Sequence, residues 1–107
     1  MTRADISTQA WLLVGMTRDL PGVLGLAGDR FTFTSHDGQL IFDAPLPEVS
    51  KVTFPWYYFG GGMKFSLGAE RYRVSFVRPT NAGGTIADIP AGRRAGKLWK
   101  AALQSRA

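Results

Sequence analysis

Three adjacent residues, Ser35, His36 and Asp37, are of the types that make up a hydrolase triad. A triad needs its nucleophile, base and carboxylate to converge in space, with the base hydrogen-bonded to both partners. Consecutive residues rarely meet that requirement, and Asp37 is followed by Gly38, a pair typical of a tight turn. We therefore interpret this segment as a turn and predict no catalytic role for it.

Metal and cofactor chemistry finds little support in the residue types. His36 is the only histidine and the chain has no cysteine, so the usual nitrogen and sulfur ligands of zinc are scarce. The glycines at 22, 25 and 28 have GxxGxxG spacing, but no predicted helix follows them as a dinucleotide loop requires. The carboxylates are spread over predicted turns and strand ends without an acid–base pair: Asp29, Asp37, Asp43 and Glu48. The sequence thus predicts a protein that is not an enzyme and uses neither metal nor cofactor.

An aromatic connection, Trp56, Tyr57, Tyr58 and Phe59, lies between Pro55 and three glycines. Four consecutive aromatic residues in an extended chain cannot all face the core, because successive side chains alternate between faces. One interpretation is a contact for a peptide, a second subunit or a membrane interface, since interfaces are enriched in aromatic residues. The alternative is packing over a corner of the fold.

The net charge of +5 is unevenly distributed. Residues 1–70 contain five Lys/Arg and seven Asp/Glu, whereas residues 71–107 contain eight Lys/Arg and one acid, Asp88. Such asymmetry is compatible with anionic lipid, an acidic protein or nucleic acid, and also with a solvated basic face. The predicted anion or lipid contacts are Arg18, Arg93, Arg94, Lys97 and Lys100. Nucleic acid ranks lowest, because no groove-reading element accompanies the basic residues.

Short segments with apolar alternation and turn residues between them predict strands. The predicted strands cover residues 11–16, 22–27, 30–34, 39–43, 48–54, 63–67 and 71–76. Pro45 and Pro47 interrupt the series after the fourth strand. The short links require antiparallel pairing, so we expect a seven-stranded, partly open antiparallel barrel.

One amphipathic helix, from Ala91 to Ser105, follows the strands. Its predicted apolar stripe has helical spacing and consists of Ala95, Leu98, Trp99, Ala102 and Leu103. A helix carrying Trp99 could close the open end of the barrel, so Trp99 is predicted to be buried.

This order of elements resembles the pleckstrin-homology (PH)-like fold, most closely the small bacterial PH-like or GRAM-like proteins. The resemblance rests on the strand order, the Pro-bounded segment EVSKVTFPW, the strand YRVSFV and the helix GKLWKAAL. It implies a non-catalytic binding module. Lipid-binding members use basic residues around the loop that joins their first two strands. Here that loop, Thr17 to Pro21, offers Arg18 next to Asp19, which argues against specific phosphoinositide binding.

We therefore expect a single domain over residues 1–107, with a core from about residue 11 to 105 and a loose N-terminal extension at 1–8. The expected function is protein–protein contact or self-association through residues 55–62. The alternative is peripheral binding to anionic membrane through the basic helix face. No apolar run approaches the roughly 20 residues of a membrane span, and no signal peptide is evident. The expected location is the cytoplasm or the inner face of the membrane.

Overall fold

The computed structural model describes residues 5–14, 18–55, 61–79 and 83–104. Within them, seven strands form one antiparallel sheet, followed by a single α-helix, α1 (Ile89–Gln104). The strands are β1 (Ile6–Val14), β2 (Arg18–Ala27), β3 (Arg30–Ser35), β4 (Leu40–Pro45), β5 (Val49–Thr53), β6 (Gly62–Leu67) and β7 (Glu70–Ser75). Short 3-10 turns, η1 (Leu46–Glu48) and η4 (Ile86–Asp88), precede β5 and α1. The predicted architecture of seven antiparallel strands and a C-terminal helix is confirmed.

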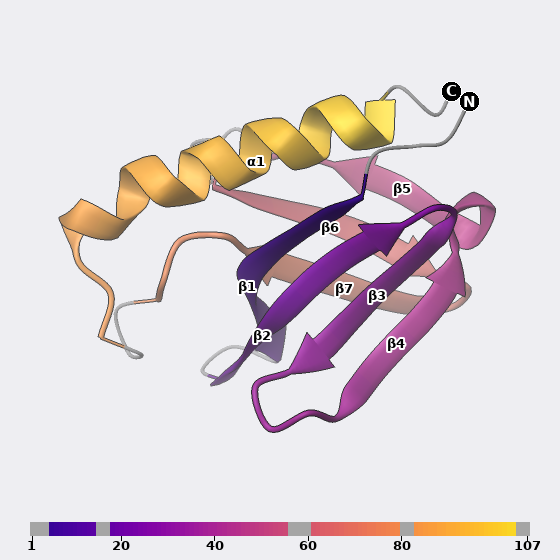
Figure 1. Cartoon of the computed structure of the whole chain (residues 1–107), viewed down its shortest axis with the longest axis horizontal. Helices are drawn as coiled ribbons and strands as arrows, with labels where there is room; N and C mark the ends of the chain where they lie inside the picture. The colour runs from indigo at the N-terminus through magenta and orange to yellow at the C-terminus, as the bar shows by residue number, and fades with distance from the viewer. Residues whose placement is uncertain (1–4, 15–17, 56–60, 80–82, 105–107) are drawn as a thin grey trace.

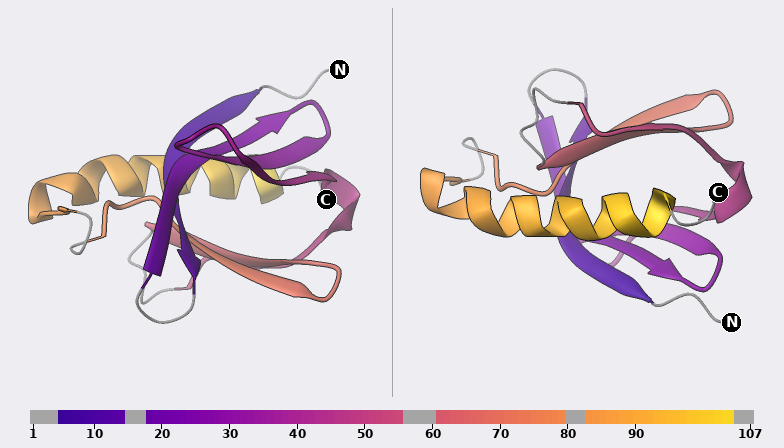
Figure 2. Two further views of the ribbon diagram at one scale, coloured as in Figure 1. Left: turned by 90° about the horizontal axis from the view of Figure 1, so that it is seen from below. Right: turned by 90° about the horizontal axis from the view of Figure 1, so that it is seen from above.

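The sheet is open, with the strand order β4-β3-β2-β1-β7-β6-β5 and with β4 and β5 as its edges. Strand β1 pairs with β2 along its whole length but with β7 only over Trp11 to Leu13. It therefore passes from one layer to the other, so that β1–β4 and β5–β7 diverge around the core (Figure 2). Helix α1 lies across the gap between these two layers (Figures 1 and 2).

Turn chemistry explains the connections within the layers. Gly28 and Gly68 each take the first position of a two-residue hairpin turn, with φ of 59° and 60°. This left-handed conformation favours glycine, which has no Cβ. Between the layers, Pro45 and Pro47 flank Leu46 in η1, so the chain leaves the ladder after β4 as predicted.

Aromatic rings fill the space between the layers. The ring of Phe31 is fully buried, and its centroid lies 5.1 Å from that of Phe65 and 5.7 Å from that of Trp99. Phe42 contacts Phe31 and Phe65 from β4, with centroid distances of 5.5 and 5.6 Å. Three of these four ring pairs meet edge to face, whereas the rings of Phe31 and Phe42 are tilted. Such aromatic contacts add to the stabilisation from burial alone.

The predicted loose extension at residues 1–8 is wrong for residues 6–8, which belong to β1 and pair with β2. Asp5 is also held against the sheet, because its Oδ1 accepts a hydrogen bond of 3.1 Å from the backbone N–H of Gly28. This part of β1 alternates between half-buried and exposed residues. A strand with one face exposed to solvent has no continuous apolar run. The prediction relied on such a run and therefore placed the start of this strand too late.

The expected loop from Thr17 to Pro21 is wrong for residues 18–21, because β2 begins at Arg18 and continues through Pro21. Proline has no N–H to donate, so it is tolerated in a strand only where no ladder partner needs one. Strand β3 ends at Ser35, level with Gly22, and the Pro21 carbonyl accepts a hydrogen bond of 2.8 Å from the His36 N–H. Pro21 therefore lies where the ladder to β3 ends.

Candidate functional site

Helix α1 approaches the sheet closely through a glycine. A Cβ added to Gly92 would clash with Cγ2 of Val77 and would lie 3.0 Å from the carbonyl carbon of Phe76. The buried residues of the helix are Gly92, Gly96, Trp99 and Leu103. Their i, i+4, i+7, i+11 spacing defines one stripe facing the sheet.

Trp99 anchors this stripe, as its predicted burial requires. Its side chain is 0% exposed, and its Nε1–H donates a hydrogen bond of 2.9 Å to Oγ1 of Thr8 in β1. The buried indole thus satisfies its one polar group while the ring packs on Phe31. This single side chain ties the helix to both the first strand and the aromatic core.

Leu98 is 55% exposed, so its predicted place in the apolar stripe is wrong. The prediction took the large apolar side chain to mark the buried face. In the structure Gly92 and Gly96 face the sheet instead. Only glycine, which has no Cβ, allows the helix to come so close to the sheet at position 92. The helix is rotated accordingly and Leu98 faces outward.

The exposed side of α1 gathers three predicted cations, Arg93, Lys97 and Lys100, which we call the cationic ridge. Their i, i+4, i+7 spacing puts them within about 60° of one another around the helix axis. Arg94 is also exposed but lies about 100° further round, on the side of Leu98. The sequence of α1 contains no acidic residue, so no intrahelical ion pair neutralises the ridge.

Arg18 is exposed and lies at the start of β2, not on α1. The structure therefore brings together three of the five predicted contacts. The predicted aromatic contact, Trp56, Tyr57, Tyr58 and Phe59, lies outside the described residues.

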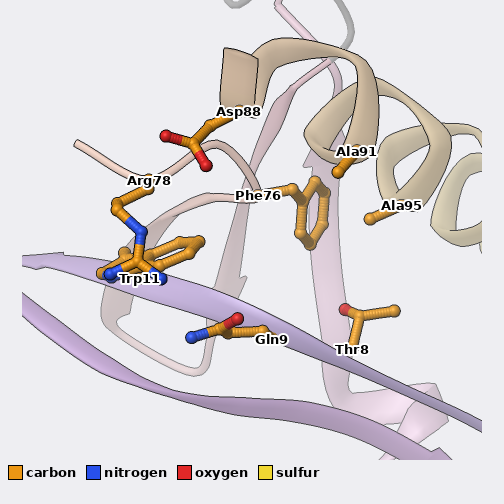
Figure 3. A pocket seen from close by; sticks show the side chains of 8 residues that line it. All are labelled: Thr8, Gln9, Trp11, Phe76, Arg78, Asp88, Ala91 and Ala95. Atoms are coloured by element: carbon orange, nitrogen blue, oxygen red, sulfur yellow. The ribbon is translucent and has the colours of Figure 1, made fainter. Parts of the chain in front are cut away.

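A hollow of ≈ 250 Å³ lies between β1, the segment after β7 and the start of α1 (Figure 3). Arg78 lies over the ring of Trp11, with its Cζ 5.3 Å from the ring centroid, and Phe76 and Ala95 line the inner wall. Asp88 borders the same hollow, but its Oδ2 accepts a hydrogen bond of 2.8 Å from the Thr85 N–H. That carboxylate therefore stabilises the start of the helix. The described residues that line this hollow include no nucleophile next to a base.

The sequence reasoning missed the pairing of Arg78 with Trp11. The two residues are 67 positions apart, and each looks ordinary in its own segment. A guanidinium over an indole face is a favourable contact that also covers the ring from water. No local signal in the sequence could have indicated it.

The segment Ser35 to Asp37 is a turn in the structure. The Ser35 hydroxyl donates to Oδ1 of Asp37, and the Gly38 N–H donates to the Ser35 carbonyl with a length of 2.9 Å. The Ser35 hydroxyl and, secondarily, the Gln39 N–H lower the pKa of the Asp37 carboxyl. In a triad the histidine is hydrogen-bonded to both the serine and the aspartate. Here the Ser35 hydroxyl donates directly to Asp37 instead, so this segment does not have the hydrogen bonds of a triad.

Comparison with protein-family models, with curated proteins and with solved structures finds no match for the chain. In the described part of the chain, no three His, Cys, Asp or Glu side chains are grouped so that they could hold a metal ion. The helix that the structure describes is not long and apolar enough to span a membrane.

Proposed function

We propose that this chain is a non-catalytic, PH-like binding module that docks on an acidic partner protein through the cationic ridge. The observation that carries the proposal is the grouping of Arg93, Lys97 and Lys100 on one exposed flank of a helix without acidic residues. Unpaired surface charges of one sign steer association with a complementary surface and select against other partners.

The PH-like assignment is supported by the order of the elements. Four meandering strands, a proline-bounded break, three further strands and a terminal helix with a buried tryptophan follow one another as in that fold. A binding role is supported further by the open sheet, which presents two edges, β4 and β5. Fold resemblance alone leaves the partner undefined, so the site must supply its chemistry.

Exposed isoleucines that precede the ridge in the chain favour a protein partner. Ile86 is 84% exposed and Ile89 is 39% exposed, and Ile89 lies one turn before Arg93 on the same flank. Protein interfaces combine such apolar contacts with a charged rim. Three charges near an anionic membrane contribute only about 1 kcal/mol each, which gives weak binding without a second anchor.

The second candidate is peripheral binding to anionic membrane through the same ridge, together with Arg94. Ile86 is the observation that favours it, because a strongly exposed isoleucine just before a helix with a cationic face could insert among lipid headgroups. Self-association through residues 55–62 stays a prediction from the sequence.

The test compares two charge reversals, Lys97→Glu on the ridge and Arg18→Glu as its matched control on β2. Both side chains are exposed, so both variants should fold. In cross-linked capture from the native host, Lys97→Glu should lose an acidic partner that wild type and Arg18→Glu retain. Flotation with phosphatidylserine vesicles at low salt tests the membrane candidate in the same three proteins. Equal capture by all three proteins, with no flotation of any, would contradict both candidates.

A further inference from the structure

A second cationic surface, unrelated to the helix, lies on the outer face of β5–β7. Met63 and Phe65 of β6 are buried in the core, so Lys64 and Ser66 between and after them face the other way. They line a hollow of ≈ 390 Å³ together with cations from the two neighbouring strands. We call its charged residues the outer cation cluster: Lys51, Lys64, Arg71 and Arg73. None of the described residues that line the hollow is acidic.

The strand register brings like charges together in this cluster. Lys64 is directly opposite Arg73, and Ser66 is directly opposite Arg71, in the antiparallel pair of β6 and β7. Side chains at directly opposite positions lie close to each other. The pairing therefore places Lys64 beside Arg73 and Ser66 beside Arg71 on the outer face of the sheet.

Lys51 reaches the same surface from a distorted backbone. Its φ is 54°, and among the described residues other than glycine it alone has a positive φ. The register shifts between Ser50 and Thr53, so Lys51 and Val52 lie opposite the single residue Phe65. Such a bulge redirects side chains and usually has glycine at the left-handed position. A lysine here costs backbone strain, which is often retained where the side chain has a function.

Ser66 is the buried polar group of the hollow. Its side chain is only 5% exposed, and within the described part of the chain its hydroxyl has no hydrogen-bond partner. A buried hydroxyl without a partner carries a desolvation cost that a bound ligand oxygen can remove. It lies in the floor of the hollow beside Arg71, where that ligand oxygen would sit.

We propose that the outer face of β5–β7 is a binding site for a phosphate group, as a phosphate monoester or a diphosphate. Arg71 and Arg73 supply planar guanidinium groups that suit phosphate oxygens, Lys51 and Lys64 supply compact charges, and Ser66 donates from the floor. The site faces away from the core that α1 covers and shares no residue with the cationic ridge. The inference therefore goes beyond the proposed function and can fail or succeed independently of it.

Titration calorimetry with inorganic pyrophosphate tests the site in the full chain. Wild type should bind one pyrophosphate, and Arg71→Gln should weaken binding at least about tenfold, as expected for a lost charge-assisted hydrogen bond. Arg18→Gln is the matched control, because it removes the same charge from the exposed start of β2, outside both the outer cation cluster and the cationic ridge, and should leave the affinity within about twofold. If both variants lose pyrophosphate affinity equally, the binding is nonspecific attraction to positive charge, and the proposal is overturned.

Lys51→Gly separates binding from folding. Glycine fits a positive φ without strain, so this variant should melt at the wild-type temperature or above it. It should nevertheless bind pyrophosphate several-fold more weakly, because one cation of the cluster is gone. A variant that keeps full affinity, or a wild type that binds no pyrophosphate, refutes the site.

Vesicles distinguish the two sources of the phosphate. If phosphatidic acid vesicles bind wild type, and pyrophosphate or Arg71→Gln releases it, the group belongs to a lipid. If pyrophosphate binds but these vesicles do not, the ligand is a soluble phosphate compound. Both outcomes support the site.

Discussion

Replacing Trp99 by alanine removes the side chain that joins α1 to the rest of the molecule. The indole is fully buried, so truncation should cost about 3–5 kcal/mol in unfolding free energy, as for other large aromatic core residues. The loss includes the ring contact with Phe31 and the hydrogen bond to Thr8. A cost of about 4 kcal/mol is a large part of the roughly 5–15 kcal/mol available to an ordinary domain. With an unfolding entropy near 2.1 cal/mol/K per residue, it lowers Tm by about 15–20 °C.

Urea denaturation followed by far-UV circular dichroism measures this loss. Trp99→Phe keeps a ring but removes the Nε1–H donor to Thr8, and should cost about 1–2 kcal/mol. Leu98→Ala, on the exposed side of the same helix, serves as the control and should stay within about 0.5 kcal/mol of wild type. The order of stabilities should be wild type and Leu98→Ala, then Trp99→Phe, then Trp99→Ala.

Two results would refute the reasoning. Trp99→Ala could remain within about 1 kcal/mol of wild type, which is too little for a buried indole. Alternatively, Leu98→Ala could cost as much as Trp99→Ala, in which case the face that α1 turns to the sheet is wrong.

Two further predictions concern a helix contact and a turn. Gly92→Ala should destabilise the protein by about 1–3 kcal/mol through overpacking against Val77, although alanine favours a helix by about 1 kcal/mol; thermal denaturation checks this, and a higher Tm contradicts it. NMR titration should give Asp37 a pKa below its ordinary 3.8, and Ser35→Ala should raise it, because the Ser35 hydroxyl is the main cause of the shift. A lowered pKa contributes stability that is present above pH 3.8 and lost as the pH falls through the folded-state pKa, so Ser35→Ala should weaken that dependence.

Local patterns were enough to predict most of the sheet. Phe31 and Phe33 alternate with threonines in β3, and both are buried as the period of two requires. Gly28 and Asp29, which lie between the predicted strands 22–27 and 30–34, form a two-residue turn, and Pro45 marks the predicted break. These features depend on residues adjacent in sequence, so their chemistry is readable without knowledge of the fold.

Element ends and the helix face were less predictable. The helix begins at Ile89, two residues before the predicted start, after the capping box of Thr85 and Asp88 and with Pro90 in its first turn. Those start signals are present in the sequence but were not used. The orientation of Leu98 was inferred from hydrophobicity, whereas the close approach at Gly92 decides it.

By itself, the sequence determined the residue types, the period of each strand and the concentration of positive charge after residue 70. Lys51 and Lys64 belong to residues 1–70, where acidic residues outnumber basic ones, so the charge count along the chain indicates a basic surface on the helix. Only the tertiary structure gathers them with Arg71 and Arg73, because strand register and the bulge at Lys51 determine which side chains share a face. Register is set by pairing between distant segments and by burial of the opposite face. A surface built from three strands is therefore a property of the folded sheet.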